Sequence, residues 1–122
     1  MEFCWVTINV RNMEQSLEFY QDFVGLKLNR RMNPMPETEI VFLGNGGTEV
    51  ELIRNVKNND CSYGKDISIG FTVSSLETSI EELKKKGISI HSGPFQPNPG
   101  IKFMYVLDPN GLKVQFVERI RQ

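Results

Sequence analysis

The side chains best suited to chemistry in this sequence are two carboxylates, Glu49 and Glu51, in a stretch that is typical of a β-strand. Side chains alternate between the two faces of a strand, so Glu49 and Glu51 share one face and Val50 and Leu52 the other. If the acidic face lines a pocket, Glu51 is partly desolvated and could act as a general base or bind a cationic ligand. If that face is wet, Glu51 is a carboxylate paired with a nearby lysine or arginine. The residues leave both interpretations open.

Histidine, the most common metal ligand, occurs once in the sequence, at His91. One chain therefore cannot build a two-histidine metal site, and a dimer would contribute only His91 twice. His91 comes just before Ser92-Gly93-Pro94 on a predicted strand. It is either a solvated or partly packed strand-end residue or a contact to a ligand.

Length and charge favour one domain that binds small molecules or proteins. The 122 residues carry a formal net charge of −1, which gives no broad positive field for nucleic acid or anionic membranes. No apolar run approaches the roughly 18 residues that cross a bilayer, and the N-terminus lacks the pattern of a signal peptide. We expect Cys4 and Cys61 to be free thiols in a reducing compartment, and the protein to be cytoplasmic.

The elements that would position these residues occur twice in the chain. Residues 8–20 resemble residues 71–83, and each segment carries the i, i+4, i+7 apolar pattern of an amphipathic helix. The identical pairs at this offset are Val10 and Val73, Glu14 and Glu77, Ser16 and Ser79, and Glu18 and Glu81. The two helices are therefore predicted to be equivalent parts of two related modules.

Each predicted helix has a start signal and a stop signal. We expect Asn12 and Ser74 to cap the two helix starts, because a side-chain oxygen there can accept a hydrogen bond from the first free amides. Gly25 and Gly87 follow the helices, where a left-handed C-terminal cap favours glycine.

The internal similarity continues into two hairpins. Phe42-Leu43 and residues 50–53 align at an offset of 64 with Val106-Leu107 and residues 114–117. Runs rich in β-branched and aromatic residues also precede and follow each helix. The predicted order is β-α-β-β-β, twice, in an α+β fold. We expect a single domain over residues 1–122, with module one at about 1–57 and module two at about 64–122.

Two stretches carry a resemblance to a known family. They are Ser16-Leu17-Glu18-Phe19-Tyr20 with Gly25-Leu26, and Leu107-Asp108-Pro109-Asn110-Gly111 followed by Val114. In this pattern, which spans nearly the whole chain, the sequence resembles the vicinal oxygen chelate superfamily of glyoxalases, bleomycin-resistance proteins and dioxygenases, and lactoylglutathione lyase-like proteins in particular. The resemblance implies that the two modules form a half-open eight-stranded sheet with a concave pocket.

The resemblance also implies four pocket positions. In the family, four strand positions usually supply His or Glu ligands to a divalent metal, and here they fall on Trp5, Glu51, Ser68 and Gln115. Indole cannot coordinate a metal, and Ser68 and Gln115 are poor or modest ligands. We therefore expect no tightly bound transition metal and an apolar plate at Trp5, while a weak Mg²⁺ or Ca²⁺ site at Glu51 and Gln115 stays open.

Arg30 matches, by its spacing from Gly25-Leu26, an arginine with which some lactoylglutathione lyases hold the glutathione carboxylate. It could equally be a solvated strand end.

The resemblance leaves three functions open. The first is a metal-free binding module, commonly a homodimer, in which Trp5, Glu51, Ser68, Gln115 and Arg30 bind a small molecule. The second is a lactoylglutathione lyase-like lyase or isomerase with a noncanonical metal or none, with Glu51 as general base. The third is a subunit with a vestigial pocket that binds another protein.

Overall fold

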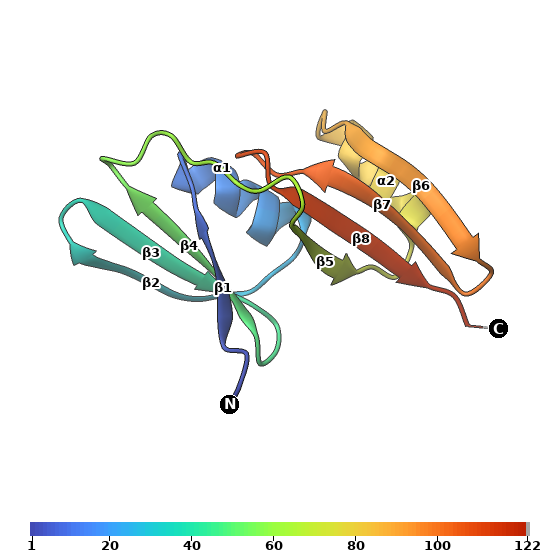
Figure 1. Ribbon diagram of the computed structural model, residues 1–122, viewed down its shortest axis with the longest axis horizontal. Helices are drawn as coiled ribbons and strands as arrows, with labels where there is room; N and C mark the ends of the chain where they lie inside the picture. The colour runs from blue at the N-terminus through green and yellow to red at the C-terminus, as the bar shows by residue number, and fades with distance from the viewer. Residues whose placement is uncertain (122) are drawn as a thin grey trace. The chain divides into compact units, whose positions relative to one another are not determined.

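The computed structural model describes residues 1–121 of the chain, which divides into two compact units, Met1–Ser62 and Tyr63–Gln122. Each unit holds a four-stranded sheet and one helical segment, as Figure 1 shows. The α+β class and the two β-α-β-β-β modules are confirmed. The hydrogen-bonded strands form two sheets of four, and their union into one eight-stranded sheet stays a prediction, as does the single domain.

In unit 1 the sheet order is β1-β4-β3-β2. Strand β1 runs parallel to its neighbour β4, whereas β3 runs antiparallel to both of its neighbours, β4 and β2. The elements are β1 (Trp5–Asn9), α1 (Met13–Leu17), the π-helix η1 (Glu18–Phe23), β2 (Leu28–Met35), β3 (Thr38–Leu43) and β4 (Glu49–Asn55).

Unit 2 repeats this topology, with the order β5-β8-β7-β6 and the same pattern of parallel and antiparallel pairs. The elements are β5 (Ser68–Thr72), α2 (Leu76–Lys85), β6 (Ile90–Asn98), β7 (Ile101–Leu107) and β8 (Lys113–Arg119).

No helix within residues 1–121 is long and apolar enough to cross a membrane.

The first helix begins as predicted and then widens. The Asn12 side chain accepts a hydrogen bond from the Gln15 amide at 3.0 Å, and Gly25 follows the helix with a φ of +87°. The π-helix over Glu18–Phe23 was not predicted. Its residues Phe19 and Tyr20 are both buried, which adds Phe19 to the predicted apolar pattern of Met13, Leu17 and Tyr20.

The cap of the second helix is one residue later than expected. Ser75, not Ser74, has the extended backbone of an N-cap, and its hydroxyl accepts from the Thr78 amide at 3.2 Å. The shift has a physical reason, since the Glu118 carboxylate accepts from the Leu76 amide at 2.7 Å and fixes where the helix begins. The stop signal is confirmed, because Gly87 has a φ of +70°.

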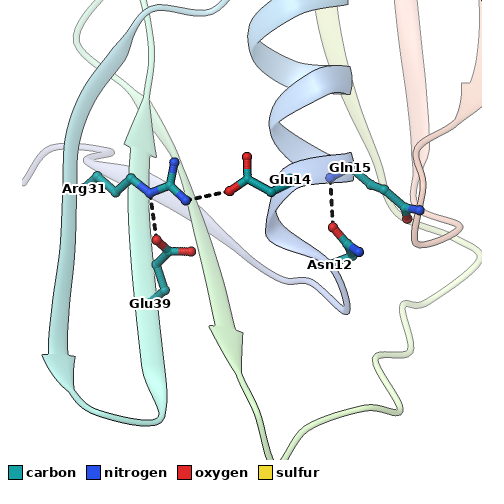
Figure 2. Close-up of polar contacts among 5 residues, drawn as sticks. All are labelled: Asn12, Glu14, Gln15, Arg31 and Glu39. Carbon is teal, nitrogen blue, oxygen red and sulfur yellow. Dashed lines mark hydrogen bonds and ion pairs between the residues drawn. The ribbon is translucent and has the colours of Figure 1, made fainter.

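Helix α1 is tied to the sheet of unit 1 by an arginine that bridges two carboxylates. The Arg31 guanidinium on β2 donates to Glu39 on β3 and to Glu14 on α1, both at 2.7 Å, as Figure 2 shows beside the Asn12 cap. The hydrogen bond with Glu39, and after it the one with Glu14, raises the pKa of Arg31, so this side chain stays charged at every accessible pH. The bridge fixes the helix against one face of the sheet.

Each sheet buries one face and leaves the other without a helix. In unit 1 the buried side is apolar, with Ile8, Val41, Leu43 and Leu52 at most 2% exposed. We call the opposite side the helix-free face. Its members, by strand register, are Trp5, Thr7, Glu49, Glu51, Phe42 and Arg30 in unit 1, and Ser68, Gly70, Lys113, Gln115, Tyr105 and Ser92 in unit 2.

The register corrects the predicted equivalence of the two hairpins. Phe42 lies opposite Glu51, and Tyr105 lies opposite Gln115, so Phe42 is equivalent to Tyr105 and not to Val106. Six residues separate Leu43 from its partner Val50, whereas seven separate Val106 from Val114. The extra residue therefore lies in the turn between β7 and β8. The sequence offset between equivalent residues of the two modules changes in this turn, and not before β7.

Candidate functional site

A row of four side chains crosses the helix-free face of unit 1. Thr7 on β1, Glu51 on β4, Phe42 on β3 and Arg30 on β2 are successive cross-strand partners. Glu51 is only 8% exposed, and the Thr7 hydroxyl donates a hydrogen bond of 2.5 Å to its Oε1. This distance lies at the short end of the range for a hydroxyl donor and an oxygen acceptor. Thr7 thus fixes the orientation of the only acidic residue among the four predicted pocket positions.

Sequence reasoning missed Thr7. Alternation along β1 already placed it on the same face as Trp5, but the pairing of β1 with β4 joins residues 44 positions apart. The parallel register sets Trp5 opposite Glu49 and Thr7 opposite Glu51. Trp5 is therefore a diagonal neighbour of Glu51, and the two lie on one face as the resemblance implied.

Trp5 presents an exposed aromatic ring on this face. The residue is 44% exposed, and its ring meets the buried Phe42 ring edge to face, with centroids 5.1 Å apart and an interplanar angle of 69°. Such a T-shaped pair holds the indole in place while leaving much of its surface to solvent. A flat ligand could stack on the open part of the ring.

Arg30 is committed to contacts within the sheet. Its guanidinium lies 4.3 Å from the centroid of the Phe42 ring and donates to Glu49 at 2.8 Å, while the Asn29 amide donates to the other oxygen of Glu49 at 3.0 Å. These two hydrogen bonds, with the one from Arg30 the larger cause, hold the pKa of Glu49 below its ordinary value. The carboxylate paired with an arginine is thus Glu49, whereas Glu51 is held by a hydroxyl.

The corresponding row of unit 2 is neutral. Gly70, Gln115, Tyr105 and Ser92 are its cross-strand partners, and the Gln115 amide donates to the Tyr105 hydroxyl at 3.2 Å. Outside the row, Ser68 is exposed and lies opposite Lys113, whose Nζ is 5.7 Å from the centroid of the Tyr105 ring. His91 is also exposed, at the start of β6.

The predicted pocket positions do not fit a transition metal. Trp5 has no lone pair to offer, Ser68 and Gln115 offer only a neutral hydroxyl and a neutral carbonyl oxygen, and one oxygen of Glu51 accepts from Thr7. Among residues 1–121, no group of three or more His, Cys, Asp or Glu side chains could hold a metal ion. Cys4 and Cys61 are free thiols, the first exposed and the second buried.

A groove of about 470 Å³ lies in unit 2, between α2 and the strands β6 and β7. Its walls include Ile80, Glu81 and Lys84 from the helix and Phe95 and Lys102 from the strands. Sequence reasoning did not find it, because the residues come together only when α2 lies beside the irregular strand β6, whose pairing with β7 shifts register three times.

The sequence from residue 3 to residue 116 matches the family model of the glyoxalase/bleomycin resistance protein/dioxygenase superfamily. The chain belongs to this superfamily. The match covers both modules, including Trp5, Glu51, Ser68 and Gln115, so the resemblance seen in the sequence is confirmed for the family as a whole.

Several relatives of this chain are lactoylglutathione lyases by name. The chain is 29% identical to a lactoylglutathione lyase of Neisseria meningitidis serogroup A, over 92% of this chain and 86% of that protein. It is 27% identical to a lactoylglutathione lyase of Haemophilus influenzae, over 97% of this chain and 93% of that protein. The trypanothione-dependent glyoxalase I of Leishmania major superposes with a TM-score of 0.82, covering 97% of this chain and 86% of that one, and its 22% identity shows the fold alone.

Proposed function

We propose that this glyoxalase-superfamily chain binds a small organic molecule on the helix-free face of unit 1, without a resident transition metal. The observation that carries the proposal is the exposed Trp5 ring beside the buried, Thr7-bonded carboxylate of Glu51. An aromatic surface with one fixed polar group is the common composition of a small-molecule site. The ring supplies contact area and the carboxylate supplies orientation.

The donor set supports binding without a metal. A divalent metal site of this family needs three or four nitrogen or carboxylate ligands, and the predicted positions offer one carboxylate, Glu51. In the proposal Trp5 and Glu51 contact the ligand, and Arg30 borders the site through Phe42 and Glu49. The binding roles expected for Ser68 and Gln115, on the helix-free face of unit 2, stay predictions. The homodimer that the resemblance implies stays a prediction.

A second candidate function is that of a lyase or isomerase like the lactoylglutathione lyases. Two observations favour it: the identity of 29% and 27% to proteins of that name, and the presence of a buried carboxylate at Glu51. In this reading Glu51 is a general base that removes a proton from the substrate. A base alone lacks the electrophile that stabilises the developing negative charge, which is usually the largest contribution to such a reaction. We therefore rank it second.

The first experiment measures binding at Trp5, which is the only tryptophan of the chain and so reports on its own surroundings. A panel of planar drugs and metabolites is screened by quenching of Trp5 fluorescence, and positive compounds are measured by calorimetry against Trp5→Phe and Trp5→Ala. We expect Trp5→Phe to keep most of the affinity, because a ring remains, and Trp5→Ala to lose about tenfold or more. A panel without a single binder, or equal affinity in all three proteins, would contradict the proposal.

A parallel titration separates the two candidate functions. Ni²⁺ and Zn²⁺ are added to wild type and to Glu51→Gln in a calorimeter, and both proteins are assayed on the hemithioacetal of glutathione and methylglyoxal. Metal bound at one per chain and lost in Glu51→Gln, together with turnover, would establish the lyase. Absence of turnover with and without metal leaves the binding function as the one supported.

A further inference from the structure

The charges on the helix-free face of unit 1 do not balance. The strand positions of this face carry two carboxylates, Glu49 and Glu51, and one guanidinium, Arg30. Arg30 and Glu49 form an ion pair of 2.8 Å, with Asn29 on the second oxygen of Glu49. Glu51 is left with a neutral partner, the Thr7 hydroxyl. The face therefore has an excess of one negative charge, located at Glu51.

The second oxygen of Glu51 remains open. Among the residues that the structure describes, Thr7 is the recorded side-chain partner of Glu51, and its bond goes to Oε1. No buried side-chain oxygen or nitrogen in this part of the chain lacks a hydrogen-bond partner, so Oε2 keeps some contact with solvent. Glu51 is thus a carboxylate that is largely removed from water, held by one oxygen, and reachable through the other.

We infer that the ligand of this face carries a protonated amine, which pairs with Oε2 of Glu51 while the adjoining part of the ligand lies against Trp5. The inference rests on the proposed function and specifies the class of ligand. A largely desolvated carboxylate without a cationic partner gains most from a charged hydrogen-bond donor. The exposed ring of Trp5, a diagonal neighbour, adds the attraction of a cation to an aromatic face.

The same contacts disfavour an anionic ligand. Arg30 is the only guanidinium among the strand positions that define this face, and it is already held by Glu49 and stacked on Phe42. A carboxylate ligand would have to displace Glu49 from Arg30 and would then leave two protein carboxylates without a cation. The face therefore selects the sign of the ligand's charge.

Thr7 is the positioning residue of this arrangement. Its hydroxyl occupies Oε1 of Glu51, so the ligand is offered Oε2 alone and in a fixed direction. Thr7→Ser keeps a hydroxyl at this place, whereas Thr7→Val keeps the shape of the side chain and removes the donor. The pair separates loss of the hydrogen bond from loss of packing.

The test uses three probes of nearly equal shape and different charge: benzylammonium, benzyl alcohol and phenylacetate. Each is titrated to about 20 mM, because fragments of this size bind weakly, and Trp5 fluorescence and amide chemical shifts are followed in the full-length protein. We expect benzylammonium to bind about tenfold more tightly than benzyl alcohol, with phenylacetate the weakest. Glu51→Gln should abolish this preference. Glu39→Gln, on the opposite side of the same sheet, should retain it.

The variants at Thr7 sharpen the result. Thr7→Val should lower the affinity for benzylammonium about threefold with little change for benzyl alcohol, and Thr7→Ser should restore it. Equal affinity for the three probes, a preference that survives Glu51→Gln, or no response to benzylammonium would overturn the inference. Quenching of Trp5 by neutral planar compounds would still support the proposed function in that event, so the two failures are distinguishable.

Discussion

The two helix-free faces have the same strand geometry and different chemistry. In unit 1 the central row is Thr7, Glu51, Phe42 and Arg30, whereas in unit 2 it is Gly70, Gln115, Tyr105 and Ser92. The carboxylate of unit 1 is held by a hydroxyl from the parallel neighbour strand, and the amide of unit 2 is bonded to a phenol from the antiparallel one. Glu51 and Gln115 each have a hydrogen-bond partner. The partner of Glu51 lies on the parallel neighbour strand, and the partner of Gln115 lies on the antiparallel one.

The difference follows from one small residue. Gly70 takes the place of Thr7, and a Cβ built on Gly70 would stand 3.3 Å from Oε1 of Gln115. The neighbour strand in unit 2 thus offers no side chain to bond, and the position opposite, Tyr105, supplies the hydroxyl instead. Repeated topology therefore constrains where side chains point without constraining which charge they carry.

The largest predicted contrast between the faces is in packing. Phe42 is 6% exposed and contacts both Trp5 and Arg30, so Phe42→Ala should lower the free energy of unfolding by about 3 kcal/mol or more. Its equivalent, Tyr105, is only half-buried, and Tyr105→Ala should cost roughly half as much. Urea unfolding of the two variants measures both losses. Equal losses would show that the two rows pack alike.

A smaller contrast is expected at the hydrogen bonds. Thr7→Val leaves Oε1 of the mostly buried Glu51 without its donor and should cost about 1–2 kcal/mol, with Thr7→Ser as the matched control. Gly70→Ala adds a methyl group near Gln115, which can turn away, and should change stability by less than about 1 kcal/mol. Thermal unfolding of the three proteins tests this, and a loss in Gly70→Ala that exceeds the loss in Thr7→Val would reverse the comparison.

The anchors of the two helices differ less. Arg31→Gln breaks two ion pairs of a side chain that is 40% exposed, so we expect a loss of about 0.5–1 kcal/mol. In unit 2, Glu118→Ala removes the acceptor of the Leu76 amide at the start of α2, and a loss of about 1 kcal/mol is expected, as for a missing helix cap. Amide hydrogen exchange should show faster opening of α1 in the first variant and of α2 in the second. Protection lost in the other helix would contradict these assignments.

The smallest effect is a dependence on pH. Folding lowers the pKa of Glu49 from its ordinary value of 4.5, so its ion pair with Arg30 stabilises the folded state above pH 4.5 and loses that effect as the pH falls through the lowered pKa. The difference in melting temperature between wild type and Glu49→Gln should therefore shrink as the pH is lowered below 4.5. Lys113, at the equivalent position of unit 2, gives the control, because Lys113→Gln should show no such change in this range.

Much of the fold could be predicted because it is encoded locally. These local features are the apolar helix patterns, the Asn12 cap and the glycines after both helices, which depend on residues within a few positions of one another. The duplication then supplied the order of strands and helices along the chain. The π-helix was missed because the i, i+4, i+7 pattern is that of an ordinary α-helix, and the sequence carries no local signal for the wider turn. The cap at Ser75 was missed because Glu118, 42 residues from Leu76, decides where α2 begins.

The candidate site was less predictable, since its contacts depend on register. Alternation placed Glu49 and Glu51 on one face, but the sequence could not say which of them pairs with an arginine. The answer depends on the pairing of β2 with β3 and of β3 with β4, which brings Arg30 to Glu49. Thr7 was missed for the same reason, because a threonine on a strand has no local feature that marks it as the partner of a distant carboxylate.

The position of the additional residue in the second hairpin has a consequence for how such a chain can change over generations. A codon gained at the tip between Val106 and Val114 leaves every strand side chain on its original side. The same codon inserted into β4 or β8 would exchange inside for outside along the rest of the strand and place an apolar residue where Glu51 or Gln115 stands. We therefore expect insertions and deletions to be tolerated at the hairpin tips and selected against within the strands. The length of the tips should then vary, while the side chains on each face of the sheet are kept.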